Sequence, residues 1–356
     1  MMGVRIKQAR IAAGFSLRDL ADKTDNYVSA QVIHKYEAGK STPGSDVLLK
    51  LAKALGVRVE FFLRPMKVNV SLSESAYRKG SNVSVKELEA IRGKVRDHLE
   101  KYMEIESLLP KSRLVDFTLP KKSQRNVKRP ADIETFARAL RKEWKLGIDP
   151  LQRPTEVLED RGVKMIMLDA EKDFDGLSCW ANDTIPVIVV RKNQTTDRLR
   201  FSIMHELGHL MLYPGKSLNQ EKAADRFAGA FLVPKQAAFS ELGEHRNKLS
   251  FYELMELRKK YGMSVQAWIY RAHDLGIITD SLYRQLFGYL ASKGLKEKQI
   301  GDDLPVDEPK RFERITLQAV EEDLISESKG AELLGISLNE VRRKLGGEIV
   351  NTATGS

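Results

Sequence analysis

The organisation of this chain is decided by the segment Phe201-Ser-Ile-Met-His205-Glu206-Leu-Gly-His209-Leu-Met-Leu212, which contains the pattern H-E-x-x-H. Its apolar residues recur at helical spacing and predict one buried helix face. They are Ile203, Leu207, Leu210 and Met211. His205 and His209 are four residues apart, so they lie on one face of the helix, one turn from each other. Two imidazoles at this spacing can bind one Zn²⁺, and Glu206 lies beside them to handle the proton of a metal-bound water. The segment therefore predicts the active-site helix of a zinc peptidase, against the alternative of a chance match on a buried helix.

A tetrahedral zinc site of this kind needs a third protein ligand and keeps the fourth position for water. The segment Asn219–Pro234 supplies a second predicted helix with an apolar stripe. The stripe consists of Ala224, Phe227, Ala228, Phe231 and Leu232. Glu221 lies in the first turn, on the side of that stripe, where a carboxylate must be paired or ligated because an isolated buried charge is very costly. The metal is its best partner. The alternative is an exposed first-turn residue favoured by the helix dipole.

Three short strands are predicted before the histidine helix, over residues 163–168, 176–180 and 186–190. Zinc peptidases with this pattern often bind an extended substrate along the edge of such a sheet. The segments at Trp180 and at Val187–Val190 are therefore candidates for the substrate-binding edge.

The composition limits the class of protein. A chain of 356 residues has room for two or three domains, each with its own core. No apolar run approaches the roughly 20 residues that a membrane span needs, and the first residues show no apolar signal segment. We therefore expect no membrane partner and no export. The single cysteine, Cys179, cannot form an internal disulfide and agrees with a cytoplasmic location. It also excludes a multi-cysteine zinc site.

The net charge of +10 permits a polyanionic partner, and the first 66 residues supply a candidate for binding it. Short helices are predicted over residues 4–13, 17–22, 28–37 and 46–55, with Ser16 and Ser29 as N-caps. The third helix keeps polar side chains on its outer face, as a helix that reads the DNA major groove does. Arg10, Arg18 and Lys40 are placed to meet phosphates. The candidate DNA-binding residues are Arg18, Ser29, Ala30, Gln31, His34, Lys35 and Lys40. The alternative is a solvated helix in a protein-docking bundle.

Two resemblances extend these interpretations. The pattern A-R-x-x-x-G-F-S-L-x-D-L-A … V-S-x-x-V-I-x-x-Y-E-x-G-K, from Ile6 to about Leu63, resembles the Xre/Cro family of phage-repressor-like DNA-binding domains. That resemblance implies five helices with the third as the reader, usually in a dimer on an inverted repeat.

The segments Arg198–Leu210 and Glu221–Pro234 together resemble the ImmA/IrrE family of metallopeptidases, which couple to repressor-like regulators. This second resemblance implies that His205, His209 and Glu221 are zinc ligands and that Glu206 is catalytic. The family usually has asparagine where this chain has Asp225.

The remaining segments are predicted to connect or to close the fold. Residues 84–87 form a capping-box pattern that begins a helix ending near residue 108. This helix packs on its own domain, on the peptidase or on a second copy. Residues 68–72 predict a short strand, and the basic stretch 118–130 predicts a solvated linker. Helices are expected over 250–261, 264–275 and 280–292. Residues 312–345 look like a second helix-turn-helix, either a DNA reader or, as we favour, a packing or dimerisation element.

The sequence thus predicts a mostly helical protein with a small β-sheet, in the α+β class. The expected domains are a helix-turn-helix domain (1–66), a connecting helix and linker (67–128), a zincin-like peptidase domain (129–300) and a C-terminal helical element with a tail (301–356). The function this implies is a DNA-binding transcriptional regulator carrying a zinc endopeptidase, which cleaves a repressor, a partner protein or itself. We expect a homodimer on double-stranded operator DNA. The alternative function is a repressor or antitoxin-type regulator whose zinc domain senses or binds a partner without proteolysis.

Overall fold

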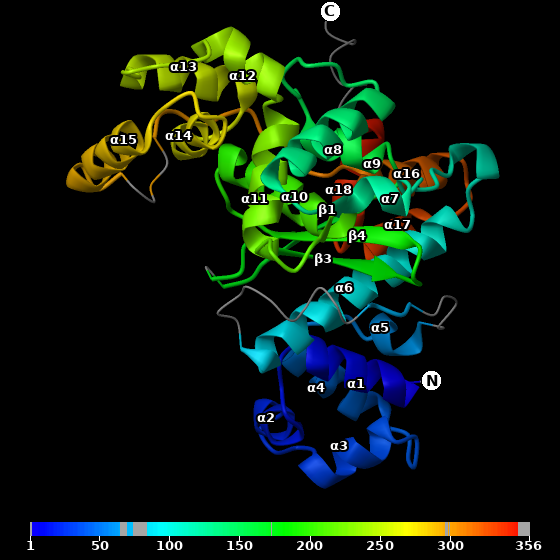
Figure 1. Ribbon diagram of the computed structural model, residues 1–356. Coiled ribbons are helices and arrows are strands. Elements are labelled where there is room, and N and C mark those ends of the chain that lie inside the picture. The colour runs from blue at the N-terminus through cyan, green and yellow to red at the C-terminus, as the bar shows by residue number, and fades with distance from the viewer. Residues whose placement is uncertain are drawn as a thin grey trace, which may run out of the picture. The chain divides into compact units, whose positions relative to one another are not determined.

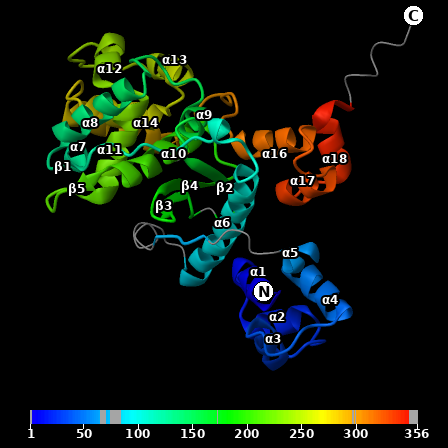
Figure 2. The ribbon, with the colours of Figure 1, turned by 90° about the vertical axis from the view of Figure 1, so that its right-hand side faces the viewer.

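The computed structural model describes residues 2–64, 70–73, 84–171, 173–295, 298 and 300–347. The chain forms two compact units. Unit 1 comprises residues 1–72, 82–114 and 312–356, and unit 2 comprises residues 73–81 and 115–311. Figures 1 and 2 show the elements of each unit. The four-part division expected from the sequence stays a prediction, but its parts are grouped differently here, because the C-terminal helices belong with the N-terminal ones.

Unit 1 begins with five short helices around a small apolar core. They are α1 (Met2–Ala12), α2 (Leu17–Lys23), α3 (Ala30–Glu37), α4 (Ser45–Leu55) and α5 (Glu60–Leu63). Both predicted caps are confirmed. Ser16 Oγ accepts a hydrogen bond from the backbone N–H of Asp19, and Ser29 Oγ accepts one from Val32. These caps fix where α2 and α3 begin.

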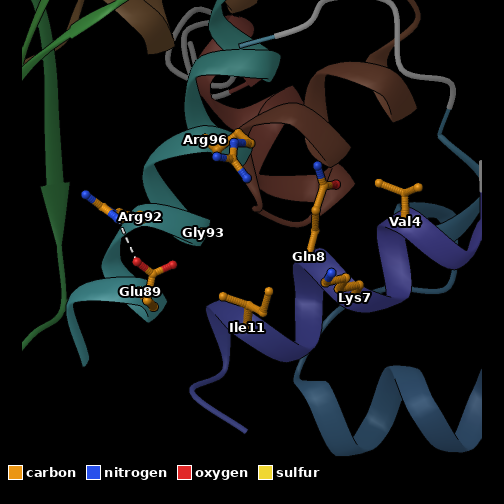
Figure 3. A pocket seen from close by; sticks show the side chains of 8 residues that line it. All are labelled: Val4, Lys7, Gln8, Ile11, Glu89, Arg92, Gly93 and Arg96. Carbon is orange, nitrogen blue, oxygen red and sulfur yellow. Dashed lines mark hydrogen bonds and ion pairs between the residues drawn. The ribbon is translucent and has the colours of Figure 1, made fainter. Parts of the chain in front are cut away.

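The long helix α6 (Val85–Glu106) packs against α1 inside unit 1 (Figure 2). The two helices approach closely at Gly93, where a Cβ atom would lie only 2.9 Å from Ala12 Cα. Nearby, the buried guanidinium of Arg5 pairs with Glu100. A groove of about 260 Å³ runs along one side of this contact (Figure 3). Residues of both helices line it: Val4, Lys7, Gln8, Ile11, Glu89, Arg92, Gly93 and Arg96. Of the alternatives open for α6, packing within its own unit is what the structure shows.

The C-terminal helices also pack in unit 1. They are α16 (Arg311–Glu321), which belongs to this unit from Phe312 on, α17 (Glu327–Leu334) and α18 (Leu338–Arg342), followed by a π-helical turn (Arg343–Gly347). Their apolar side chains form one cluster with the end of α6, which continues into a 3-10 turn (Lys111–Arg113). The cluster consists of Tyr102, Ile105, Leu109, Ile315, Ala319 and Leu333. The cations of α18 and the residues after it pair with carboxylates, Arg342 with Glu327 and Lys344 with Glu313. This arrangement favours the packing element over a second DNA reader.

Unit 2 contains a three-stranded sheet in the order β2-β4-β3. β4 (Ile185–Arg191) is the central strand, parallel to β2 (Lys164–Leu168) and antiparallel to β3 (Gly176–Ala181). The three predicted strands are therefore confirmed. The prediction that Val187–Val190 forms an edge is wrong, because β4 is paired on both sides. Only the Trp180 segment, in β3, lies at an edge of this sheet.

The helices of unit 2 pack around the sheet and around one another (Figure 1). They are α7 (Lys122–Arg125), α8 (Pro130–Glu143), α9 (Pro154–Glu159), α10 (Thr196–Met211), α11 (Gln220–Leu232), α12 (Lys235–Leu242), α13 (Phe251–Tyr261), α14 (Val265–Asp274) and α15 (Asp280–Ser292). The histidine helix α10 contacts the sheet through β3 and β4 and packs along α11 on another side. None of the described helices is long and apolar enough to cross a membrane.

The basic stretch 118–130 is not a solvated linker throughout, which corrects the prediction. It contains α7, the short strand β1 (Asn126–Val127) and the start of α8. β1 pairs in parallel with β5 (Tyr213–Pro214), directly after α10. Arg125 is buried and donates hydrogen bonds to the carbonyl oxygens of Leu210 and Met211. The strand predicted over 68–72 lies partly outside the described residues. Of its described part, only Leu72 is a bridge residue.

Candidate metal centre

The helix α10 presents different residues to its two neighbours. Its predicted apolar face, Ile203, Leu207, Leu210 and Met211, is buried in the core of unit 2. Gly208 brings α10 close to α11, since a Cβ atom there would lie 3.1 Å from Ala224 Cα. The first turn of α11, capped by Asn219, therefore lies against the histidine pair.

Three ligand atoms converge between α10 and α11. His205 Nε2 lies 3.0 Å from His209 Nε2. Glu221 Oε2 lies 3.3 Å from His205 Nε2 and 3.5 Å from His209 Nε2. All three atoms lie within 4.8 Å of one another. The structure thus brings together the three residues that the sequence singled out as ligands.

The donor set fits a zinc ion. Two imidazole nitrogens and one carboxylate oxygen are the three protein ligands of a catalytic zinc site. Glu221 Oε1 is buried without a hydrogen-bond partner, which a coordinated carboxylate would explain. A bound cation would also relieve the close approach of the two Nε2 atoms.

Asp225, one helical turn after Glu221, lies behind His205. The Nδ1–H of His205 donates a hydrogen bond of 2.7 Å to Asp225 Oδ1. This contact fixes the tautomer that leaves Nε2 free to act as a ligand. Burial alone would lower the pKa of His205, but the hydrogen bond to Asp225 and the nearby carboxylates outweigh it and raise that pKa. Burial and the charge of His205 lower the pKa of His209.

Glu206 points the other way, toward β3. Only 7% of the residue is exposed, and its Oε2 accepts a hydrogen bond of 2.8 Å from the Ser178 hydroxyl. Burial raises the pKa of Glu206 to about 7, against the opposing effects of the His205 charge and the Ser178 hydrogen bond. Ser178 and its neighbour Gly176 escaped the sequence reasoning. The available signal was a glycine and a hydroxyl in an otherwise apolar strand.

The candidate DNA-binding residues lie on and around α3. Gln31, His34 and Lys35 are exposed on this helix, and Ala30 is half-buried at its start. Ser29, Arg18 and Lys40 are exposed nearby. The phosphate contact expected of Arg10 is wrong. Its guanidinium is largely buried and forms two hydrogen bonds with Glu37 at the end of α3, at 2.6 and 2.9 Å. Arg10 therefore ties α1 to α3.

The small helical domain and the α10–α11 centre define a class of protein in which a DNA-binding module and a metallopeptidase-like domain share one chain. Comparison with known families agrees with both halves. The helix-turn-helix family matches residues 6–62, and the IrrE N-terminal-like domain matches residues 158–273. The chain belongs to the DNA-binding helix-turn-helix regulators and carries an IrrE N-terminal-like domain in the same polypeptide.

One curated relative is similar to the N-terminal part of the chain. It is YonR of Bacillus subtilis (strain 168), described as an SPbeta prophage-derived HTH-type transcriptional regulator. The two sequences are 35% identical over 74 residues, which is 21% of this chain and 67% of YonR.

Proposed function

We propose that this chain is a transcriptional regulator whose second unit is a zinc-dependent endopeptidase, acting on a repressor, on a partner protein or on the chain itself. The observation that supports it is the convergence of His205, His209 and Glu221, with the buried Glu206 on the same helix. A module that only binds a partner has no need of Glu206.

The residues divide the work of peptide hydrolysis. The zinc ion, when bound, lowers the pKa of a water molecule toward neutrality and polarises the peptide carbonyl. Glu206 accepts the proton of that water and passes it to the leaving amine. Its raised pKa, about 7, suits a group that must both take and release a proton near neutral pH. Asp225 holds His205 in the tautomer that keeps Nε2 available.

The decisive substitution is Glu206→Gln, which removes the proton acceptor and nearly keeps the shape. We expect the purified variant to bind about one zinc ion per chain, as the wild type does, because Glu206 is not a ligand. We also expect it to lose cleavage of repressor-like proteins encoded nearby and of itself, followed by the sizes of the products on a gel. If regulation in cells continues unchanged in the variant, peptidase chemistry is not the function, and the domain acts as a sensing or binding module.

We propose that the exposed face of α3 reads the operator, with Gln31 and Lys35 at base edges. A DNA fragment from upstream of the chain's own gene is expected to bind the full chain, with an affinity that falls steeply as salt rises. Lys35→Ala is expected to weaken that binding about 10-fold or more. The exposed Lys222→Ala, in unit 2, serves as the control. Absence of binding by the wild type at low salt would contradict the proposal. The homodimer and the cytoplasmic location stay predictions from the sequence.

A further inference from the structure

The strand β3 differs from its neighbours in two residues. Side chains alternate between the faces of a strand, and Leu177, Cys179 and Ala181 are buried apolar residues on one face. Gly176 and Ser178 fall on the opposite face. Ser178 is only 2% exposed, and a buried hydroxyl needs a partner. That partner is Glu206 Oε2, at 2.8 Å.

Gly176 leaves the space that the Glu206 side chain occupies. A Cβ atom at this position would lie 3.2 Å from Glu206 Cγ and 3.3 Å from Oε1. It would also lie 3.0 Å from the carbonyl oxygen of Val189 in β4. These distances are tighter than ordinary van der Waals contact, so a side chain here would push Glu206 aside. Two alternate residues of β3 therefore surround one carboxylate, Gly176 by giving room and Ser178 by donating a hydrogen bond.

We infer that Ser178 is a positioning residue for Glu206. Within the described part of the chain, its hydroxyl is the one hydrogen-bond donor to this carboxylate. The bond holds Oε2 against β3 and fixes the rotamer of Glu206. Oε1 is left as the oxygen that receives a proton. The role is carried by geometry and does not require Ser178 to touch a substrate. The catalytic consequence rests on the proposed function, whereas the fixed rotamer does not.

The bland alternative is a serine that only satisfies its own hydroxyl. Three variants separate the two interpretations. Ser178→Ala removes the donor, and Ser178→Thr keeps a hydroxyl on a residue that suits a strand. Ser202→Ala is the matched control, because Ser202 lies on α10 and bonds to Gln194 rather than to Glu206.

The first experiment measures binding of two small zinc ligands to the zinc-loaded full chain. Acetohydroxamic acid delivers a proton to a neighbouring base when it binds a metal, whereas 2-mercaptoethanol binds as a thiolate that has lost its proton to solvent. We expect Ser178→Ala to weaken acetohydroxamic acid about 10-fold, the effect of losing one hydrogen bond to a charged group. Binding of 2-mercaptoethanol is expected to change less than about twofold, the limit we set for no loss of a hydrogen bond.

Ser178→Thr is expected to restore acetohydroxamic acid binding, and Ser202→Ala to leave both affinities unchanged. Equal binding of acetohydroxamic acid by Ser178→Ala and the wild type would overturn the inference. A wild-type chain that binds neither zinc nor the two probes would instead overturn the proposed zinc site.

The second experiment needs no metal. A crystal structure of metal-free Ser178→Ala is expected to show Glu206 in a different rotamer from the wild type. An unchanged rotamer overturns the inference even if the chain never binds zinc. Where a protein substrate is in hand, Ser178→Ala should lower kcat about 10-fold and leave KM unchanged, because the bond acts on the proton acceptor and not on the peptide.

Discussion

At the scale of single residues, Asp225 is where this chain departs from the asparagine usual in the family that it resembles. The structure gives the departure a physical meaning. The Asp225 carboxylate accepts the Nδ1–H of His205 at 2.7 Å, and a charged acceptor makes a stronger hydrogen bond than an amide oxygen. A stronger bond behind a ligating histidine raises the basicity of its other nitrogen.

We therefore expect Asp225→Ala to weaken zinc binding about 10- to 100-fold. Asp225→Asn keeps an acceptor oxygen and should weaken it less. Competition with a chelating dye gives both affinities. The control is Asp280→Asn, which alters another aspartate–histidine pair, that of Asp280 with His273 at 2.7 Å, outside the metal cluster. An Asp225→Ala chain that binds zinc as tightly as the wild type would show that this contact does not tune the site.

At the scale of elements, α10 carries the site and its C-terminus is held by a residue distant in sequence. Helices end with carbonyl groups that lack partners within the helix. Arg125, from the short α7, donates to the carbonyls of Leu210 and Met211 at 2.6 and 2.7 Å. The guanidinium thereby satisfies the end of the helix whose preceding turn carries His209.

Replacing Arg125 by methionine keeps much of the side-chain volume and removes both hydrogen bonds. Two buried carbonyls then lose their partner, so we expect unit 2 to lose about 2–4 kcal/mol of unfolding free energy. Chemical denaturation of the zinc-free chain measures this loss. Lys122→Met is the control, because Lys122 lies in the same short helix and is exposed. Its effect should stay within about 0.5 kcal/mol. Equal stabilities of the two variants would contradict the role of Arg125.

At the scale of the whole molecule, the two ends of the chain belong to one unit. The apolar side chains of α16 and α17 pack with Tyr102, Ile105 and Leu109 at the end of α6. The C-terminal helices therefore contribute to the unit that holds the DNA-binding module, although unit 2 separates them from it in sequence.

A chain that ends at residue 311 is expected to lose stability in unit 1. Removing Ile315, Ala319 and Leu333 exposes their partners on α6, at a cost on the order of 5 kcal/mol. Calorimetry should show an earlier transition, weaker DNA binding and an unchanged zinc content. A chain that ends at residue 347 keeps the whole cluster and serves as the control. A shortened chain whose unit 1 unfolds at the wild-type temperature would refute the packing role.

The features determined by the sequence itself are those encoded by short-range periodicity. The spacing of His205 and His209, the stripe around them and the first-turn position of Glu221 follow from the geometry of a helix. The caps at Ser16 and Ser29 are equally local. Such patterns state which face of an element is buried and which residues share it.

Only the tertiary structure decided which element covers each face. The central position of β4, which overturned the expected edge, depends on pairing between strands and not on the composition of either. Arg125 resembled a linker residue until α10 met it, because its partners lie more than 80 residues away. The bond from Ser178 to Glu206, the pairing of Arg10 with Glu37, and the return of the C-terminal helices to α6 have the same cause. Each contact joins residues far apart along the chain, and local periodicity carries no information about such partners.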